Sequence, residues 1–247
     1  MGGRGTDVAR EAAALVLLDD DFGAIARAVR LGRRIYDNLR KAIGFIFAVH
    51  VPIAGLALLP LLLGMPLLFG PVHIAFLEMV IDPVCSLVFE AESGEKDIMR
   101  RRPRAADEPL IPRGLIGWHL FQGTLAFAIC AGAFLVGGEL GMPEPELRAL
   151  TFLTLVLAIV SLIFVDRSFG AALAGGAHRP STALLVVLLI IALALAVALF
   201  WPPAMALFRF GTLHRDDIAI AVACAAALLA ILEFAKFLRV QPQLSSP

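Results

Sequence analysis

Two carboxylates lie one helical turn apart in a stretch of the chain that is otherwise apolar. Glu78 and Asp82 stand in the segment Phe-Leu-Glu-Met-Val-Ile-Asp-Pro at 76–83, and this spacing places both side chains on one face of a helix. In hydrocarbon, two like charges persist only if they share a cation, share a proton or meet a cationic partner. Pro83 disfavours the helical conformation at Asp82, so we expect the segment to unwind there and to expose carbonyl oxygens. Such oxygens suit a hard cation or a proton; the alternative is that the acids face lipid or only hold helices together.

A histidine stands in a second apolar stretch, close to another proline. His50 lies in Phe-Ala-Val-His-Val-Pro-Ile at 47–53, and Pro52 removes a backbone donor and so frees the carbonyl of Ala48. An open carbonyl beside an imidazole is a candidate ion or proton site, whereas a structural histidine bonded to a neighbouring helix explains the same residues. The candidate ligands of a transported cation are therefore Glu78, Asp82 and His50.

Other polar groups in apolar stretches have plainer interpretations. His119, Gln122 and Thr124 either line a path or form hydrogen bonds that serve packing. Glu233 and Lys236, spaced i, i+3 near the end of the last apolar stretch, are expected to form a pair whose lysine extends to the membrane surface.

The composition is that of a polytopic membrane protein. Of the 247 residues 60% are hydrophobic and only 17% are charged, and the mean hydropathy is +0.86. Because 21 Lys+Arg balance 21 Asp+Glu, no bulk positive field exists to hold nucleic acid. The three cysteines are far apart in apolar surroundings, which argues against disulfides and thiolate metal sites.

Six stretches have the roughly 20 apolar residues that a helix needs to cross a bilayer. We expect an all-α membrane domain over 42–237, whose six transmembrane helices lie at about 42–63, 71–90, 114–137, 148–165, 181–201 and 217–237. Residues 1–41 hold eight Lys/Arg and the loop 91–113 holds six, so the positive-inside rule places both termini in the cytoplasm of a multi-pass protein of the cell membrane. Residues 238–247 are then a cytoplasmic tail.

The first 41 residues differ from the rest of the chain. Leu-Val-Leu-Leu at 15–18, ended by three aspartates, is typical of a buried strand, and apolar residues at helical spacing follow it without a break into the first span. We therefore expect a short cytosolic α/β remnant and one long helix that continues into the membrane. A lone strand cannot satisfy its backbone hydrogen bonds, so it requires a sheet that this chain does not contain.

Several motifs of this region are similar to those of a known family. They are Met-Gly-Gly-Arg-Gly-Thr-Asp-Val-Ala-Arg-Glu-Ala-Ala at 1–13, Leu-Val-Leu-Leu-Asp-Asp at 15–20, Gly-Arg-Arg-Ile-Tyr-Asp-Asn-Leu-Arg-Lys at 32–41 and Asp-Ile-Met-Arg-Arg-Arg-Pro-Arg at 97–104. Together they resemble the end of the phosphorylation domain, the stalk and the loop after the sixth helix of cation-transporting P-type ATPases, in the calcium and sodium pump branch. The resemblance is specific to about residue 113 and topological beyond it. It implies that the strand belongs to a Rossmann-like sheet and that the six spans are the family's fifth to tenth helices.

The resemblance also defines what this sequence lacks. The phosphorylation motif, the actuator loop, the nucleotide domain, the magnesium-site motif and the first four membrane helices have no counterpart here, so the chain resembles a carboxy-terminal fragment. We expect it to hold no cofactor of its own; Mg²⁺ and ATP are implied for the complete pump, and its partners are the lipid bilayer, the transported cation and the missing amino-terminal portion. The rival expectation is an independent six-span channel, secondary transporter or pump-associated subunit.

The family's ion-binding positions are altered in this chain. A usual Asn and Glu of the fifth helix fall on His50 and Ile53, and a usual Asn, Thr and Asp of the sixth fall on Glu78, Ile81 and Asp82. The loss of a carboxylate at Ile53 makes a second calcium site unfavourable, whereas an imidazole suits a softer cation such as manganese or a proton-coupled cycle.

Overall fold

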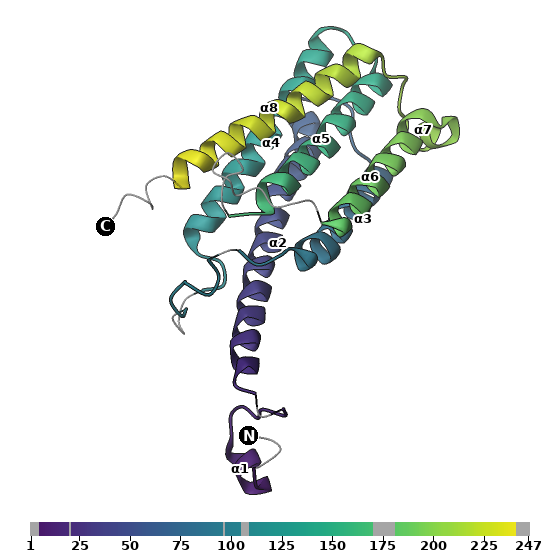
Figure 1. Cartoon of the computed structure of the whole chain (residues 1–247). Coiled ribbons are helices and arrows are strands. Elements are labelled where there is room, and N and C mark those ends of the chain that lie inside the picture. Colours follow the sequence, from purple (N-terminus) through teal and green to yellow (C-terminus); the bar gives the residue numbers. More distant parts are fainter. Residues whose placement is uncertain (1–4, 20, 96, 105–108, 170–180, 241–247) are drawn as a thin grey trace.

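The computed structural model describes residues 5–19, 21–95, 97–104, 109–169 and 181–240 of the chain. These residues form helices joined by connecting segments of different lengths (Figure 1). In chain order the elements are α1 (Asp7–Ala12), α2 (Gly23–Leu62), α3 (Pro71–Pro83), the π-helix η1 (Val84–Phe89), α4 (Arg113–Glu139), α5 (Glu144–Asp166), α6 (Thr182–Phe200), α7 (Pro202–Phe208) and α8 (Arg215–Val240).

Six of these segments are long and apolar enough to cross a membrane. They are α2, α3 with η1, α4, α5, α6 and α8, and the most apolar 18-residue windows within them have mean hydropathies between 1.8 and 3.3. The expectation of an all-helical membrane domain with six transmembrane helices is confirmed by this arrangement.

The expected strand at 15–18 is wrong. The part of the chain that the structure describes contains no strand, and Leu15 and Leu18 are 59% and 83% exposed. The physical reason is that an extended segment needs neighbouring strands for its backbone hydrogen bonds. The described residues supply none, so the expected cytosolic α/β remnant is not seen among them, and the described part of the segment before α2 holds the short helix α1.

Helix α2 is the longest element and extends far beyond the other helices (Figure 1). Its 40 residues span about 60 Å at 1.5 Å per residue. The helix starts where the Gly23 N–H donates to Asp21 Oδ1 at 2.7 Å, and it continues through Pro52 and Pro60 without ending. One helix therefore joins the amino-terminal region to the membrane domain, as the unbroken helical pattern predicts.

Glycines set the close approach of α2 to α4. A Cβ on Gly44 would lie 2.1 Å from His119 Nε2, and a Cβ on Gly55 would lie 2.5 Å from the Phe127 ring. A Cβ on Gly123 of α4 would lie 2.5 Å from the carbonyl oxygen of Ala48. Small residues of this kind let two membrane helices pack backbone to backbone.

Helix α5 is the centre of the bundle. In its most apolar window 83% of the residues are buried, and it packs against α2, α4 and α8. The hydroxyls of Thr151, Thr154 and Ser161 donate to carbonyls of the preceding turn of α5, so these polar groups are satisfied within the core.

Candidate functional site

Glu78 and Asp82 lie on the side of α3 that the described residues leave uncovered. Both side chains are exposed, whereas the opposite side of the helix is buried in the bundle through Phe76, Leu77, Val80 and Ile81. The expected common face for the two acids is therefore present. An exposed carboxylate pair on an apolar membrane helix requires something to neutralise it.

The helix changes its winding directly after Asp82. The α-helical turns of α3 end at Pro83, and the wider π-helical turns of η1 follow. Pro83 has no N–H to give to the carbonyl of Met79, one turn earlier, and π-turns often occur where a helix accommodates such a defect near a functional site. The Asp82 carbonyl accepts a hydrogen bond from Ser86 Oγ at 2.7 Å. The expectation that the helix unwinds here is therefore wrong, because the wider winding absorbs the proline.

His50 is exposed on α2, and its ring is oriented by its own helix. Nδ1 lies 2.8 Å from the carbonyl oxygen of Ile46, and since a carbonyl can only accept, Nδ1 carries the proton. In the neutral form of this imidazole Nε2 is then the nitrogen with the lone pair that a cation requires. The Ala48 carbonyl, expected beside this imidazole, instead lies against Gly123 of α4, so the two groups do not form one site.

The candidate ligands do not make a complete cation site by themselves. Within the described ranges no group of three or more His, Cys, Asp and Glu side chains is close enough to hold a metal ion. The structure brings Glu78 and Asp82 together on α3 and leaves His50 on α2 outside such a group. Cys85, which the sequence argument set aside, is half-buried on η1, three residues after Asp82.

The loop after η1 is fastened to the part of α2 that precedes the apolar span. Asn38 Nδ2 donates to the Glu92 carbonyl at 2.9 Å, and Lys41 Nζ lies 2.8 Å from Glu95 Oε1. Glu92 also pairs with Arg167, the residue after α5, at 2.9 Å. We call the contacts between α2 and residues 90–104 the stalk clamp.

A second set of contacts continues the stalk clamp toward the amino terminus. Arg33 donates to the carbonyls of Ile98 and Arg101 at 2.7 and 2.9 Å. Arg101 in turn binds Asp37 at 2.7 Å and Asp97 at 2.9 Å. The hydrogen bonds from Arg101 hold the pKa of Asp97 below its usual value, and the two carboxylates raise the pKa of Arg101. The clamp thus ties the end of the acid-bearing helix to α2 by charged contacts.

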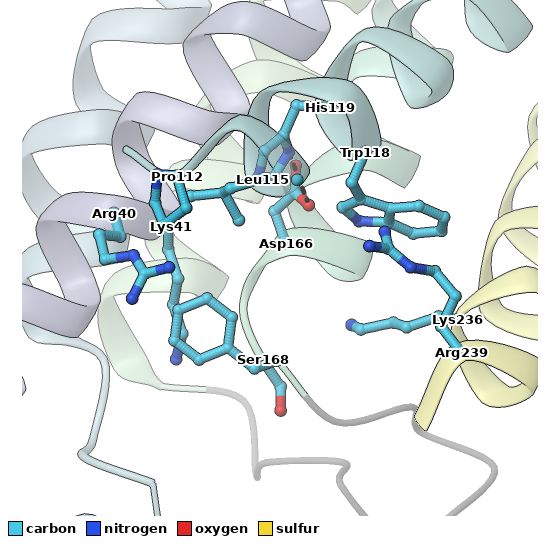
Figure 2. A pocket seen from close by; sticks show the side chains of 12 residues that line it. Arg40, Lys41, Pro112, Leu115, Trp118, His119, Asp166, Ser168, Lys236 and Arg239 are labelled. Carbon is cyan, nitrogen blue, oxygen red and sulfur yellow. Dashed lines mark ion pairs between the residues drawn. The ribbon is translucent and has the colours of Figure 1, made fainter. Parts of the chain in front are cut away.

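A further polar cluster lies in the interior of the bundle. His119 Nδ1 donates to Gln122 Oε1 at 2.7 Å, and Gln122 Nε2 donates to Asp166 Oδ1 at 2.9 Å; all three residues are buried, whereas Thr124 is exposed. The hydrogen-bonded packing role therefore fits His119 and Gln122. Figure 2 shows His119 and Asp166 pointing toward each other at the wall of a cavity.

The sequence did not predict that Lys236 and Arg148 are buried and donate hydrogen bonds to backbone carbonyls of other segments. Lys236 lies 3.7 Å from Glu233, as expected, but it is buried and donates to the Val165 carbonyl, so it does not extend to the membrane surface. Arg148 is buried one turn inside α5 and donates to carbonyls of the α2–α3 connection and of residue 209. The spacing of Glu144 and Arg148, i, i+4 at the start of an apolar helix, is the signal that marks this arginine.

Comparison with known proteins agrees with these features. Residues 66–238 match the family described as cation transporting ATPase, C-terminus. The chain is 33% identical over 229 residues to a calcium-transporting ATPase of Bacillus subtilis and 32% identical over 236 residues to one of Listeria monocytogenes, which covers 92% of this chain in both cases. It is 38% identical over 135 residues, 54% of this chain and 13% of the relative, to the human sodium/potassium-transporting ATPase subunit alpha-4.

The family match, the six apolar helices and these identities define the class as the membrane part of P-type pumps. The chain belongs to the cation transporting ATPase family and corresponds to its carboxy-terminal region. It spans about a quarter of the length of the two bacterial relatives, 25% and 26%. The expected resemblance is confirmed, and the chain is a multi-span membrane protein.

Proposed function

We propose that this chain forms the cation-transporting half of an ATP-driven pump and that Glu78 and Asp82 bind the transported cation. The observation that carries the proposal is the carboxylate pair on the uncovered face of α3, in a chain of this family. A bare pair of acids in hydrocarbon costs several kcal/mol. A cation held between them removes that cost.

The remaining ligands come from segments outside this chain. The described residues hold no complete metal cluster, and the chain spans only about a quarter of its bacterial relatives. The face that carries Glu78 and Asp82 is the surface on which such segments pack. His50 Nε2, exposed on α2, adds a ligand or a charge partner from the same domain.

The cation we infer is a single divalent ion that accepts a nitrogen ligand. The relatives from Bacillus subtilis and Listeria monocytogenes are described as calcium-transporting. Calcium prefers six to eight hard oxygen ligands, and this chain offers an imidazole at 50 and no carboxylate at 53. A cation of manganese type tolerates that exchange better.

Helix α2 and the stalk clamp supply the mechanical link. ATP and Mg²⁺ act in parts of the pump outside this chain, and a movement of those parts reaches the membrane along α2, which is continuous from Gly23 to Leu62. The stalk clamp joins α2 to the loop that follows the acid-bearing helix, so both helices respond together and change access to the site. We infer that both ends of the chain lie on the cytoplasmic side, and the positive charge of residues 1–41 and 91–113 supports this orientation.

The test uses the pump assembled from this chain and its amino-terminal portion. We expect Glu78→Gln and Asp82→Asn each to abolish cation-stimulated phosphorylation by ATP, while phosphorylation by inorganic phosphate, which needs no bound cation, is kept. Glu90→Gln is the matched control, because Glu90 is an exposed acid at the end of η1. Normal cation stimulation in both acid variants would show that the carboxylates are structural.

A further inference from the structure

A cavity of about 260 Å³ lies where four helices meet at one boundary of the membrane domain (Figure 2). The lining comes from the start of the apolar part of α2, from the first turns of α4, from the end of α5 with the residues that follow it, and from the last turns of α8. It includes Arg40 and Lys41 of α2, Trp118 of α4, Asp166 of α5 and Lys236 and Arg239 of α8.

The lining has an excess of positive charge. Four cationic side chains and one carboxylate contribute to it. Lys41 is already paired with Glu95 and Lys236 with Glu233. The carboxylate, Asp166, is 5% exposed, accepts a hydrogen bond from Gln122 and lies 3.6 Å from His119 Nδ1, so its partners at these distances are not the arginines.

Two arginines of the lining are held in place by aromatic rings. Arg40 Cζ lies 5.6 Å from the centroid of the Tyr36 ring and 5.9 Å from that of Phe169. Arg239 Cζ lies 4.5 Å from the centroid of the Trp118 ring. A ring face orients a guanidinium group without using its N–H donors. The ring contacts therefore leave the terminal Nη donors available to a ligand.

Neither arginine has an acidic partner in the part of the chain that the structure describes. Ion pairs within 4.0 Å involve the two lysines but not Arg40 or Arg239. The Nε atom of Arg40 is buried and has no hydrogen-bond partner among the described residues, which is rare for a buried donor. The cavity thus presents two preorganised guanidinium groups without an anion.

An apolar surface leads from the cavity toward the lipid. Trp118 is half-buried and stacks on Phe121 with 5.7 Å between ring centroids, and Phe121 is 46% exposed. Tryptophan is enriched at the level of lipid headgroups, where one part of the ring is apolar and the other is hydrated. A ligand with a phosphate group and an acyl chain matches both parts of this environment.

We propose that the cavity binds the phosphate ester headgroup of an anionic phospholipid. Arg40 and Arg239 are the phosphate ligands, since arginine binds phosphate oxygens through two parallel N–H donors. The acyl chain lies along Trp118 and Phe121. Free phosphate shares the headgroup chemistry but makes no use of the apolar surface. The site does not depend on which cation the pump carries.

The experiment uses the tryptophans as reporters. The chain has two tryptophans, Trp118 and Trp201, so the Trp201→Phe variant leaves Trp118 as the only one. This variant is placed in phosphatidylcholine nanodiscs that contain increasing amounts of phosphatidylglycerol with brominated acyl chains, which quench fluorescence on contact. We expect brominated phosphatidylglycerol to associate with Trp118 roughly tenfold more strongly than brominated phosphatidylcholine, because two arginines near the surface each favour an anionic lipid. Equal quenching by the two lipids would overturn the proposal.

Two sets of variants separate the cavity from general surface charge. Arg40→Gln with Arg239→Gln should remove the preference for phosphatidylglycerol. Arg100→Gln with Arg113→Gln removes the same charge from exposed positions outside the cavity and should keep it. An equal loss in both pairs would contradict a specific site.

A third variant tests the cavity without a change of charge. A Cβ at Gly114, which lines the cavity, meets no atom within 4 Å, so Gly114→Leu adds an apolar side chain at the cavity wall and should also remove the preference. Full quenching of Gly114→Leu by brominated phosphatidylglycerol would count against the assignment. Inorganic phosphate is the last arm: if millimolar phosphate alone changes Trp118 emission to saturation, the ligand is free phosphate and the lipid assignment is wrong.

Discussion

Arg101 Nη1 lies 2.7 Å from Asp37 Oδ2, although 64 positions separate the two residues in the sequence. The side chain of Asp37 is 7% exposed and that of Arg101 is 36% exposed. Asp37 of α2 is therefore buried, whereas the arginine that binds it stays in partial contact with solvent. Through this pair the loop that follows the acid-bearing helix is fixed to the longest helix of the chain. We therefore expect a displacement of α2 to move this loop as well.

Loss of this pair should loosen the loop without unfolding the bundle. We expect Arg101→Gln to lower the local opening free energy of residues 97–104 by about 1 kcal/mol, at the low end for a charged hydrogen bond because Arg101 is partly exposed. Hydrogen exchange of this segment in detergent measures the change. Arg100→Gln, at an exposed neighbouring position, should leave the exchange unaltered; equal effects of the two variants would argue against the clamp.

The carboxyl of Asp97 should titrate below its usual range because Arg101 donates hydrogen bonds to it. A carboxyl with a lowered folded pKa stabilises the loop at pH values above its unfolded pKa, and this contribution disappears as the pH falls through the folded pKa. No change is thus expected between pH 8 and about 5. Carbon NMR of the carboxyl group gives the midpoint, which should rise in Arg101→Gln. An unchanged midpoint would refute the contact.

Gly44 should tolerate no side chain. In Gly44→Ala the new Cβ would lie 2.1 Å from His119 Nε2, which displaces His119 and disrupts its bond to Gln122; we expect a loss of about 2 kcal/mol in stability. Gly32→Ala is the control on the same helix, because a Cβ there meets nothing within 4 Å, and it should be neutral or stabilising by up to about 1 kcal/mol. Thermal unfolding in detergent compares them. The double variant with His119→Ala should recover part of the loss.

Arg148 should be irreplaceable by lysine. Its guanidinium donates to the carbonyls of Leu68 at 2.9 Å, Arg209 at 3.2 Å and Leu67 at 3.3 Å, and a lysine is a single point of charge that cannot match this fork. We expect Arg148→Lys to lower stability by at least about 2 kcal/mol and Arg148→Met by more, because buried carbonyls lose their donors. Unfolding by denaturant measures both, with the exposed Arg215→Gln as reference. Wild-type stability in the lysine variant would exclude the carbonyl network.

The membrane helices were predictable from the sequence because lipid forces a length and an apolar composition on each span. The common face of Glu78 and Asp82 was also predictable, because residues four positions apart lie on one side of a helix. The strand at 15–18 could not be tested by pattern alone. Its apolar run indicates a strand only when neighbouring strands exist, and the described residues include none to pair with it.

Contacts between polar residues that are far apart in the chain could not be predicted from the sequence. Nothing in the pattern relates Arg101 to Asp37, or Lys236 to the carbonyl of Val165, since these contacts depend on how the helices pack. The π-helical turns after Pro83 were missed because a proline signals a defect but not the way in which the helix absorbs it. A pattern within one helix can be recognised from neighbouring residues in the sequence. The stalk clamp and the cavity consist of residues from several helices, so they form only when these helices pack together.

The central claim is that Glu78 and Asp82 bind the transported cation, and equilibrium binding tests it most directly. The assembled pump is equilibrated with radioactive manganese or calcium, and the bound ion is counted per phosphorylatable pump. We predict one divalent cation per pump, preferentially manganese, at least tenfold weaker binding in Glu78→Gln and in Asp82→Asn, and unchanged binding in the Glu90→Gln control. Wild-type binding in the variant that carries both Glu78→Gln and Asp82→Asn would contradict the account.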